Sequence, residues 1–236
     1  MANIENVFIF AKNEFKNMRI HVTISSTERP IDFNYQSLLT GCVHKWMGKN
    51  NVFHGKLSLY SFSWLQGVKI LKDGVQIIDG SSFTLSFYDT SLLKTVVSGM
   101  LDDPSMFNGA RVMDIRVLQA PQFSDKERFF LASPVLIKRH KDFNETHYTY
   151  TDKESDDFMM ETLKSKANLA GVDTSGLKVY FDRTYHSPKT KIVSYKGIQN
   201  KVSICPIIIE GTPEIISLAW HVGVGNSTGV GFGALK

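Results

Sequence analysis

The sequence predicts an α+β fold in which two tandem ferredoxin-like (RRM-like) domains leave a cleft between their sheets. Two observations carry this prediction. Strand-like and helix-like patterns recur in the order strand, helix, strand, strand, helix, strand in each half of the 236-residue chain. A polar segment at residues 121–127 separates the halves. We therefore expect domains at residues 18–122 and 128–236, after an amino-terminal extension of residues 1–17.

The first half opens with two strongly patterned elements. Residues 19–24 alternate apolar and polar side chains at period two, which predicts a strand. A helix is predicted at residues 34–47, because apolar side chains, Leu38 among them, recur there at helical spacing. Asn34 is the expected N-cap, and Gly48 ends the pattern.

The rest of the first half reads as strands around one further helix. That helix is predicted at residues 91–101, with Asp89 or Thr90 as its cap. The strands are expected at residues 59–64, 68–71, 75–78, 82–88 and 111–118. The last of them closes the first domain.

The second half repeats this order. It opens with a strand at residues 131–139, which Pro134 interrupts, and continues with a helix at residues 154–170. Thr212 as N-cap and Pro213 at the first helical position predict the start of a last helix. The glycine-rich end that follows is expected to form a short closing strand. The remaining strands are predicted at residues 177–181, 191–195 and 202–209.

Composition and charge narrow the class of protein. The chain has 27 Lys and Arg against 23 Asp and Glu, and its net charge of +4 permits a polyanionic partner. Cys42 and Cys205 are far apart and lack metal-ligand spacing, which argues against a disulfide scaffold and fits a reducing compartment. The amino terminus has neither a secretory signal nor a membrane span. We expect a cytoplasmic protein with no membrane partner.

Basic residues gather in the second half. Between residues 183 and 209 there is no acidic residue, and aromatic side chains are interleaved with basic ones. Such a run is typical of a nucleic-acid surface, although solvated loop charge gives the same pattern. The candidate RNA-binding side chains in this run are Arg183, Lys189, Lys191, Lys196 and Lys201.

The last fourteen residues, 223–236, contain five glycines. Glycine reaches positive φ and permits close approach, and successive N–H groups in such a loop can form an anion site. A dinucleotide fold is excluded, because neither a helix nor an acidic residue follows the glycine motif. A purely structural turn stays open as the alternative. The candidate phosphate-facing residues are Gly223, Gly225, Asn226, Ser227, Thr228, Gly229 and Gly231.

His44 lies on the face of the first predicted helix opposite its apolar stripe. Its neighbours on that face, including Ser37, Thr40 and Gly41, are small. A glycine inside a helix costs up to about 1 kcal/mol relative to alanine, a cost that close packing of a partner would explain. The neighbouring sequence adds Lys45 and Lys49 as RNA-binding candidates, and His54 and Lys56 as further candidates for chemistry.

His44, His54 and Lys56 are suited to cleaving RNA without a metal ion. One imidazole can take the proton of a ribose 2′-OH and the other can protonate the departing 5′-oxygen, because an ordinary imidazole pKa near 6.5 allows both forms near neutrality. Lysine can stabilise the charge on the phosphate in the transition state. The histidines lack metal-ligand spacing, and no cofactor is expected. The alternative is that both histidines are ordinary solvated side chains.

The segment HVGVGNSTGVGFG at residues 221–233 resembles the glycine-rich signature of the CRISPR-associated endoribonucleases that process precursor CRISPR RNA, members of the RAMP superfamily. The resemblance extends to the opening strand from Met18, the helix at residues 35–46, the strand at residues 59–62 and the Ser-Pro-Val segment at 133–135. It covers nearly the whole chain after residue 17.

The resemblance implies paired ferredoxin-like domains and metal-independent cleavage of repeat RNA, leaving a 2′,3′-cyclic phosphate and a 5′-hydroxyl. It implies His44 as the helix-borne base, His54 as the acid and Lys56 as the lysine entering the next strand, and the order of the two histidines stays open. The expected partner is CRISPR repeat RNA in precursor crRNA, and subunits of an interference complex or a homodimer stay open. Two other functions stay open: a non-catalytic crRNA-binding subunit, and a module that binds a small anion in the glycine loop.

Overall fold

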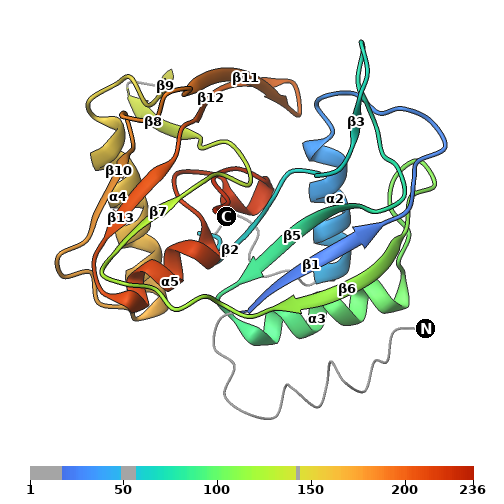
Figure 1. The fold of residues 1–236 in the computed structure, drawn as a ribbon, viewed down its shortest axis with the longest axis horizontal. Coiled ribbons are helices and arrows are strands. Elements are labelled where there is room, and N and C mark those ends of the chain that lie inside the picture. Colours follow the sequence, from blue (N-terminus) through green and yellow to red (C-terminus); the bar gives the residue numbers. More distant parts are fainter. Residues whose placement is uncertain (1–17, 49–56, 142–143) are drawn as a thin grey trace.

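A computed structural model describes residues 18–48, 57–141 and 144–236 (Figure 1). The amino-terminal half and the carboxyl-terminal half lie side by side, each built on an antiparallel sheet with helices. The predicted extension at residues 1–17 lies outside the described residues. Within those residues, no helix combines the length and apolar character needed to cross a bilayer.

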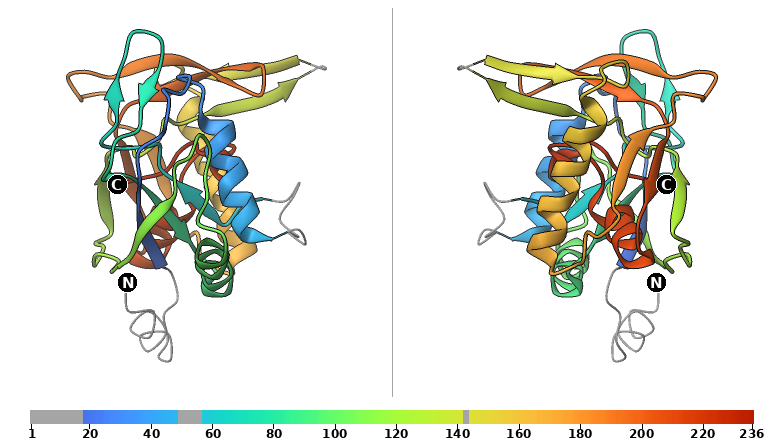
Figure 2. Two further views of the ribbon diagram at one scale, coloured as in Figure 1. Left: turned by 90° about the vertical axis from the view of Figure 1, so that its right-hand side faces the viewer. Right: turned by 90° about the vertical axis from the view of Figure 1, so that its left-hand side faces the viewer.

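The amino-terminal half is built on a four-stranded sheet with the order β2-β5-β1-β6. Helices α2 (Gln36–Met47) and α3 (Thr90–Asp102) cover one face of it (Figure 2). The strands are β1 (Met18–Ile24), β2 (Tyr60–Phe62), β5 (Ser81–Phe87) and β6 (Val112–Leu118). A small hairpin of β3 (Lys69–Ile70) and β4 (Val75–Gln76) is inserted between β2 and β5.

The sequence patterns explain the packing of this half. The apolar positions of β1, at Ile20, Val22 and Ile24, are fully buried under the helices, as period-two alternation requires. Helices α2 and α3 approach closely at Gly99, where a Cβ would lie 2.9 Å from the Cα of Trp46. The predicted cap of α3 is confirmed, because the side chain of Asp89 accepts a hydrogen bond from the backbone N–H of Ser91 at 2.7 Å.

The carboxyl-terminal half has a three-stranded sheet with the order β10-β13-β7. Its strands are β7 (Lys126–Phe129), β10 (Lys178–Phe181) and β13 (Ile207–Glu210), and its helices are α4 (Ser155–Ala170) and α5 (Pro213–Val222). Two hairpins are added to this frame, β8 (Ile137–Lys141) with β9 (Asn144–Tyr148), and β11 (Lys189–Tyr195) with β12 (Ile198–Ile204).

The strand orders confirm the predicted fold class. In the first half the second and fourth strands of the strand–helix–strand–strand–helix–strand unit lie at the sheet edges, which is the ferredoxin-like arrangement. In the second half the fourth strand is reduced to one bridge between Leu131 and Leu235. The closing strand expected at the end of the chain is therefore a single bridge, next to which Lys236 N donates to Phe130 O at 2.9 Å.

Helix α2 differs in detail from the prediction. It begins after Tyr35, and the expected cap Asn34 instead accepts a hydrogen bond from Ser194 N at 3.2 Å. Leu38, which was expected in the buried stripe, is exposed, and Thr40, which was expected on the open face, is buried. The buried face of α2 is thus rotated away from Leu38, because the helix packs on both the sheet and α3.

Two strands of the second half also differ from the prediction. The run expected at residues 202–209 is divided, because Pro206 has no N–H to continue the ladder. The strand expected at residues 131–139 is not continuous either, and β7 begins before it, inside the predicted linker. Pro134 lies in the gap between β7 and β8, where its carbonyl accepts a hydrogen bond from Gly233 N at 2.8 Å.

Helix α5 joins the two halves. Arg19 in β1 donates to the carbonyl oxygen of Trp220 at 2.5 Å, and its guanidinium lies 3.5 Å from the centre of the indole ring. Burial lowers the pKa of Arg19 to about 9, so it stays charged at neutral pH. Ser61 in β2 donates to the carbonyl of His221 at 2.8 Å. These bonds hold the carboxyl end of α5, and the glycine segment after it, against the sheet of the other half.

Candidate active site

His44 is placed near the carboxyl end of α2, on its half-buried side. Its Nε2 atom lies 3.3 Å from the hydroxyl oxygen of Tyr60 in β2. Gly41 precedes it by one helical turn and is exposed, and a Cβ there would meet no described atom within 4 Å. The imidazole therefore has the Tyr60 hydroxyl as a neighbour and lies one helical turn from Gly41, whose own side of the helix is uncrowded by described residues.

Tyr60 connects His44 to the glycine-rich segment, which we define as residues 223–233. The Tyr60 hydroxyl donates to the carbonyl oxygen of Gly229 at 3.2 Å. Burial raises the pKa of Tyr60 to about 12, so it remains a neutral phenol. With its hydrogen directed to Gly229, the oxygen presents a lone pair to Nε2 of His44 and holds the orientation of the ring.

The glycine-rich segment fits closely along β2. A Cβ on Gly229 would collide with the Ser58 hydroxyl and lie 2.9 Å from the Tyr60 hydroxyl. Gly231 has a φ of +88° and faces the ring of Phe62, 2.8 Å from where its Cβ would be. Thr228 donates from its hydroxyl to the carbonyl oxygen of Tyr60 at 3.2 Å. Glycine is required at 229 and 231 by protein contacts, whatever else the segment binds.

Lys166 supports this segment from the other side. The lysine, in α4, is 2% exposed, and its ammonium donates to the carbonyls of Val222 and Gly223 at 2.9 and 3.2 Å and to the hydroxyl of Thr228 at 2.9 Å. Three acceptors match the three donors of a charged lysine. Burial nevertheless lowers the pKa of Lys166 to about 7. A chain of contacts thus runs from Lys166 through Thr228 to Tyr60 and His44.

Most of the glycine-rich segment is buried against protein. Its predicted phosphate-facing glycines and Thr228 are buried, whereas Asn226 and Ser227 are half-buried. The Asn226 side chain accepts a hydrogen bond from Lys138 N at 2.9 Å, and Ser227 has a φ of +60°. The RNA-facing role assigned to these seven residues stays a prediction, for which Asn226 and Ser227 are the most accessible members.

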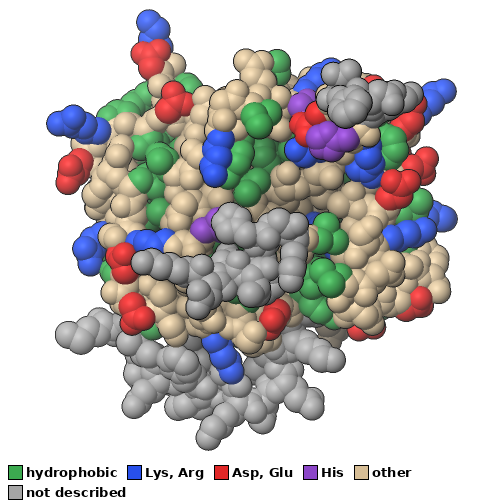
Figure 3. Space-filling view, turned by 180° about the vertical axis from the view of Figure 1, so that it is seen from behind, with side chains coloured by type: hydrophobic (Ala, Val, Ile, Leu, Met, Phe, Trp, Pro, Cys, Tyr) green, Lys and Arg blue, Asp and Glu red, His purple; other side chains and the backbone are tan. Residues whose placement is uncertain are grey.

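The basic residues divide into two groups. Lys45 bonds to Asp103 at 2.8 Å, and Arg183 bonds to Asp156 at 2.5 Å, so both charges are compensated within the protein. The other four, which we name the hairpin lysines, are exposed on β11, β12 and their turn and form no ion pair with a described residue. They are Lys189, Lys191, Lys196 and Lys201. Figure 3 shows basic side chains spread over the rear face among acidic ones rather than gathered in one block.

Three predicted residues cannot be placed, because Lys49, His54 and Lys56 lie outside the described residues. The residues that the sequence reasoning missed are Tyr60 and Lys166, and no local pattern singles them out. Cys42 and Cys205 are buried free thiols. Within the described ranges, no group of three or more His, Cys, Asp or Glu side chains is arranged to hold a metal ion.

Tandem ferredoxin-like halves with a glycine-rich carboxyl-terminal segment define the class of fold. The sequence profile described as CRISPR associated protein Cas6, C-terminal, matches residues 118–236. The chain therefore belongs to the Cas6 family of endoribonucleases that process CRISPR RNA. A search of curated protein sequences finds no match.

Solved structures are similar over nearly the whole chain. The product of a Cas6-related gene from Pyrococcus furiosus has a TM-score of 0.81 and 19% identity, with 93% of this chain and 98% of that chain covered. A RAMP protein that binds different RNA substrates has a TM-score of 0.78 at 19% identity, with the same 93% and 98% covered. Thermus thermophilus Cas6 has a TM-score of 0.58 at 11% identity, with 95% and 100% covered. At these identities the likeness shows the fold.

Proposed function

We propose that this protein is a metal-independent endoribonuclease that cleaves CRISPR repeat RNA in the precursor transcript by attack of a ribose 2′-OH. The observation that carries the proposal is the contact between the His44 imidazole and the Tyr60 hydroxyl, which orients the ring one helical turn from Gly41. It occurs in a chain of the Cas6 family.

The proposed reaction needs one base and one acid. The His44 imidazole takes the proton of the 2′-OH, the 2′-oxygen attacks the adjacent phosphorus, and the bond from phosphorus to the 5′-oxygen breaks. A protonated group then gives its proton to the 5′-oxygen, which leaves a 2′,3′-cyclic phosphate and a 5′-hydroxyl. The substrate supplies its own nucleophile, so the protein needs to position the RNA and move protons. His54 as the acid and Lys56 as the cation at the phosphate complete the proposed set.

RNA binding is assigned to the hairpin lysines and to the glycine-rich segment. Exposed lysines without an acidic partner can neutralise phosphates, and such contacts supply most of the non-specific affinity for nucleic acids. A structural relative with a TM-score of 0.78 is a RAMP protein that binds different RNA substrates. Another, with a TM-score of 0.60, is a Cas6 product complex. These likenesses support RNA as the ligand of the same fold here.

The direct test is single-turnover cleavage of the host repeat RNA in EDTA by the wild type and by His44→Ala. Loss of a positioned general base lowers rates by about 10²- to 10⁴-fold, whereas RNA affinity is expected to stay unchanged. His186→Ala is the matched control, because that histidine is exposed in the other half. The control should cleave at the wild-type rate.

Two results would contradict the proposal. Equal rates for His44→Ala and the wild type would remove His44 from the chemistry. Tight binding without cleavage by the wild type would favour the second function, a non-catalytic crRNA-binding subunit of an interference complex. The exposed hairpin lysines are compatible with that function, since lysines can bind phosphate without chemistry.

A further inference from the structure

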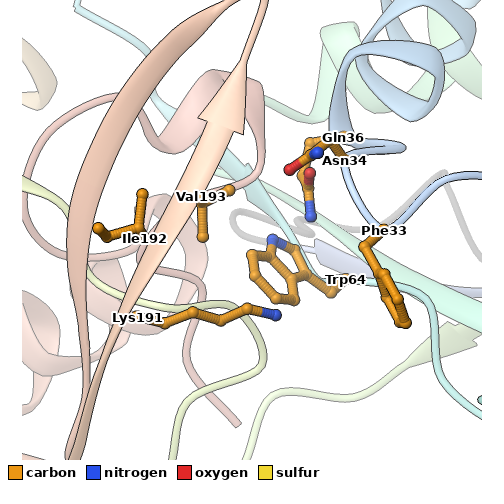
Figure 4. Close-up of a pocket in the computed structure, with 7 residues that line it drawn as sticks. All are labelled: Phe33, Asn34, Gln36, Trp64, Lys191, Ile192 and Val193. Atoms are coloured by element: carbon orange, nitrogen blue, oxygen red, sulfur yellow. The ribbon is translucent and has the colours of Figure 1, made fainter. Parts of the chain in front are cut away.

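A pocket of about 320 Å³ opens between the start of α2 and the β11–β12 hairpin (Figure 4). It is separate from the candidate active site: Gln36 and His44 are eight residues apart on α2, which corresponds to about 12 Å along the helix axis. Both halves of the molecule line it, with Phe33, Asn34, Gln36 and Trp64 from one and Lys191, Ile192 and Val193 from the other.

Trp64 supplies a fixed aromatic surface in this pocket. The indole N–H donates to the carbonyl oxygen of Gly231 at 2.9 Å, so the glycine-rich segment sets the plane of the ring. The ring is half-buried, and the ammonium of Lys191 lies 5.3 Å from its centre. An aromatic face beside a cation is the combination that binds an unpaired base and its phosphate.

Gln36 supplies a hydrogen-bond acceptor in the same pocket. The residue is 1% exposed, and its Oε1 atom has no hydrogen-bond partner among the described residues. Buried side-chain oxygens are nearly always paired in proteins, so an unpaired one that lines a pocket indicates a donor on a ligand. The phosphodiester of an RNA backbone and an ionised carboxylate have only acceptor oxygens and would leave this atom unpaired. The edge of a nucleobase carries N–H groups that satisfy it.

A hydrogen bond between the two halves fixes the walls of the pocket relative to each other. The Asn34 side chain accepts a hydrogen bond from Ser194 N at 3.2 Å, which ties the start of α2 to β11. Along β11, Lys191 and Val193 share one face, because side chains alternate, and Val193 is buried. Lys201, which pairs with Ile192, lies on the opposite face. Of these two lysines, Lys191 lines the pocket and Lys201 does not.

We propose that this pocket binds one unpaired nucleobase of the RNA. Trp64 stacks on the base, Gln36 Oε1 accepts an N–H from the base edge, and Lys191 neutralises the adjoining phosphate. The inference rests on the proposed function, because the strand held here continues along α2 toward His44. The pocket then fixes which phosphate reaches His44, and so contributes to the choice of cleavage position.

The test uses repeat RNA with a single 2′-deoxy nucleotide at the scissile position, so that binding is measured without cleavage. Trp64→Leu is expected to raise the Kd by roughly 5- to 100-fold, the range for losing one base–aromatic stack. Gln36→Met, which keeps the side-chain length and removes the acceptor, should raise it about 5-fold. Lys191→Met should weaken binding more than its matched control Lys201→Met, although both remove one charge from the same hairpin.

A second measurement locates the base without relying on any one variant. Abasic substitutions are placed one at a time along the RNA. With the wild type, an abasic substitution at one position should raise the Kd as much as the Trp64→Leu change does. With Trp64→Leu, the same abasic substitution should raise the Kd little further. RNA should also quench tryptophan fluorescence in the wild type and not in Trp64→Leu, because Trp46 and Trp220 are 2% and 7% exposed. If Trp64→Leu fails to fold, Gln36→Met and Lys191→Met replace it in the abasic series.

The outcomes separate this inference from the proposed function. At saturating protein, Trp64→Leu should still cut all-ribose RNA but at more than one position, because the pocket no longer fixes the scissile phosphate, whereas His44→Ala should not cleave. The pocket proposal is overturned if the pocket variants bind RNA as tightly as the wild type and no abasic substitution changes the Kd less in Trp64→Leu than in the wild type. If the wild type also cleaves, the proposed ribonuclease function stands. If one abasic substitution weakens binding by the wild type but not by Trp64→Leu, and the wild type never cleaves, the pocket proposal is supported and the ribonuclease proposal is rejected. Failure of the wild type to bind repeat RNA overturns both.

Discussion

The two halves of the molecule share one topology, but the fourth strand of that topology is complete only in the amino-terminal half. In the amino-terminal half, β6 pairs with β1 through six residue pairs and completes a four-stranded sheet. In the carboxyl-terminal half the fourth strand is reduced to the bridge between Leu131 and Leu235. The glycine-rich segment before that bridge instead lies along β2 of the other half, where Thr228 and Gly229 bond to Tyr60.

Because of this difference, residues from both halves build the candidate site, and neither half contains it alone. His44 and Tyr60 come from the amino-terminal half, whereas the segment that orients Tyr60 comes from the carboxyl-terminal half and is held by Lys166. The site geometry therefore depends on contacts between the halves. Variants that disturb only those contacts should affect cleavage more than they affect the stability of either sheet.

Among variants at the contacts between the two halves, we expect the largest loss of cleavage from Gly229→Ala. The added Cβ would collide with the Ser58 and Tyr60 hydroxyls, so the segment must move away from β2. A displacement of about 1 Å near the chemistry costs about 10²-fold in rate, and we expect a loss of that size in single-turnover cleavage. Val230→Ala, a half-buried neighbour that adds no clash, is the control. A wild-type rate for Gly229→Ala would show that the segment does not set the site geometry.

Lys166 is expected to make the free energy of unfolding depend on pH. The native state loses the Lys166 proton near pH 7, whereas an unfolded lysine keeps it until about pH 10.5. Between these values the unfolded state binds more protons, so the contribution of Lys166 to the free energy of unfolding rises with pH and is lost as pH falls through 7. The slope is at most about 1.4 kcal/mol per pH unit. Urea denaturation from pH 6 to 9.5 should show this rise in the wild type relative to Lys166→Met, and parallel curves would contradict it.

Tyr60→Phe tests the orientation of His44 from the amino-terminal side. Removing the hydroxyl deletes the bonds to Gly229 and His44, at a cost of about 1 kcal/mol in the free energy of unfolding. We expect cleavage to fall about 10-fold, since the imidazole loses its fixed neighbour. Tyr88→Phe is the matched control, because its hydroxyl also bonds across the halves, to Ala170 O at 3.3 Å, away from His44. Similar cleavage by the two variants would remove Tyr60 from the site.

The smallest effect is expected at Gly41. Alanine there should stabilise α2 by up to about 1 kcal/mol, because no described atom lies within 4 Å of the new Cβ. If RNA occupies that space, the Kd for repeat RNA should rise a few-fold while the unfolding midpoint rises as well. A stabilised variant with unchanged affinity would show that the open face beside His44 does not contact the RNA.

The sequence predicts the parts of this structure that depend on neighbours along the chain. Period-two alternation in β1, the Asp89 cap of α3 and the Thr212-Pro213 start of α5 are local signals, and the structure confirms all three. The prediction of Asn34 as the N-cap of α2 was wrong, because its side chain accepts a hydrogen bond from Ser194, 160 residues away. The same limit applies to the site. The position of His44 near the end of α2 follows from the sequence pattern, whereas the contacts of Tyr60 and Lys166 depend on the glycine-rich segment folding back on β2.

In the proposed reaction a ribose 2′-OH, activated at His44, attacks the adjacent phosphate and cuts its own strand. The most direct measurement compares cleavage in EDTA of all-ribose repeat RNA with the same RNA carrying one 2′-deoxy nucleotide at the scissile position. We expect a single cut with a 2′,3′-cyclic phosphate end in the first RNA, and binding without cleavage of the second. Cleavage of the 2′-deoxy RNA at the same position and rate would contradict it.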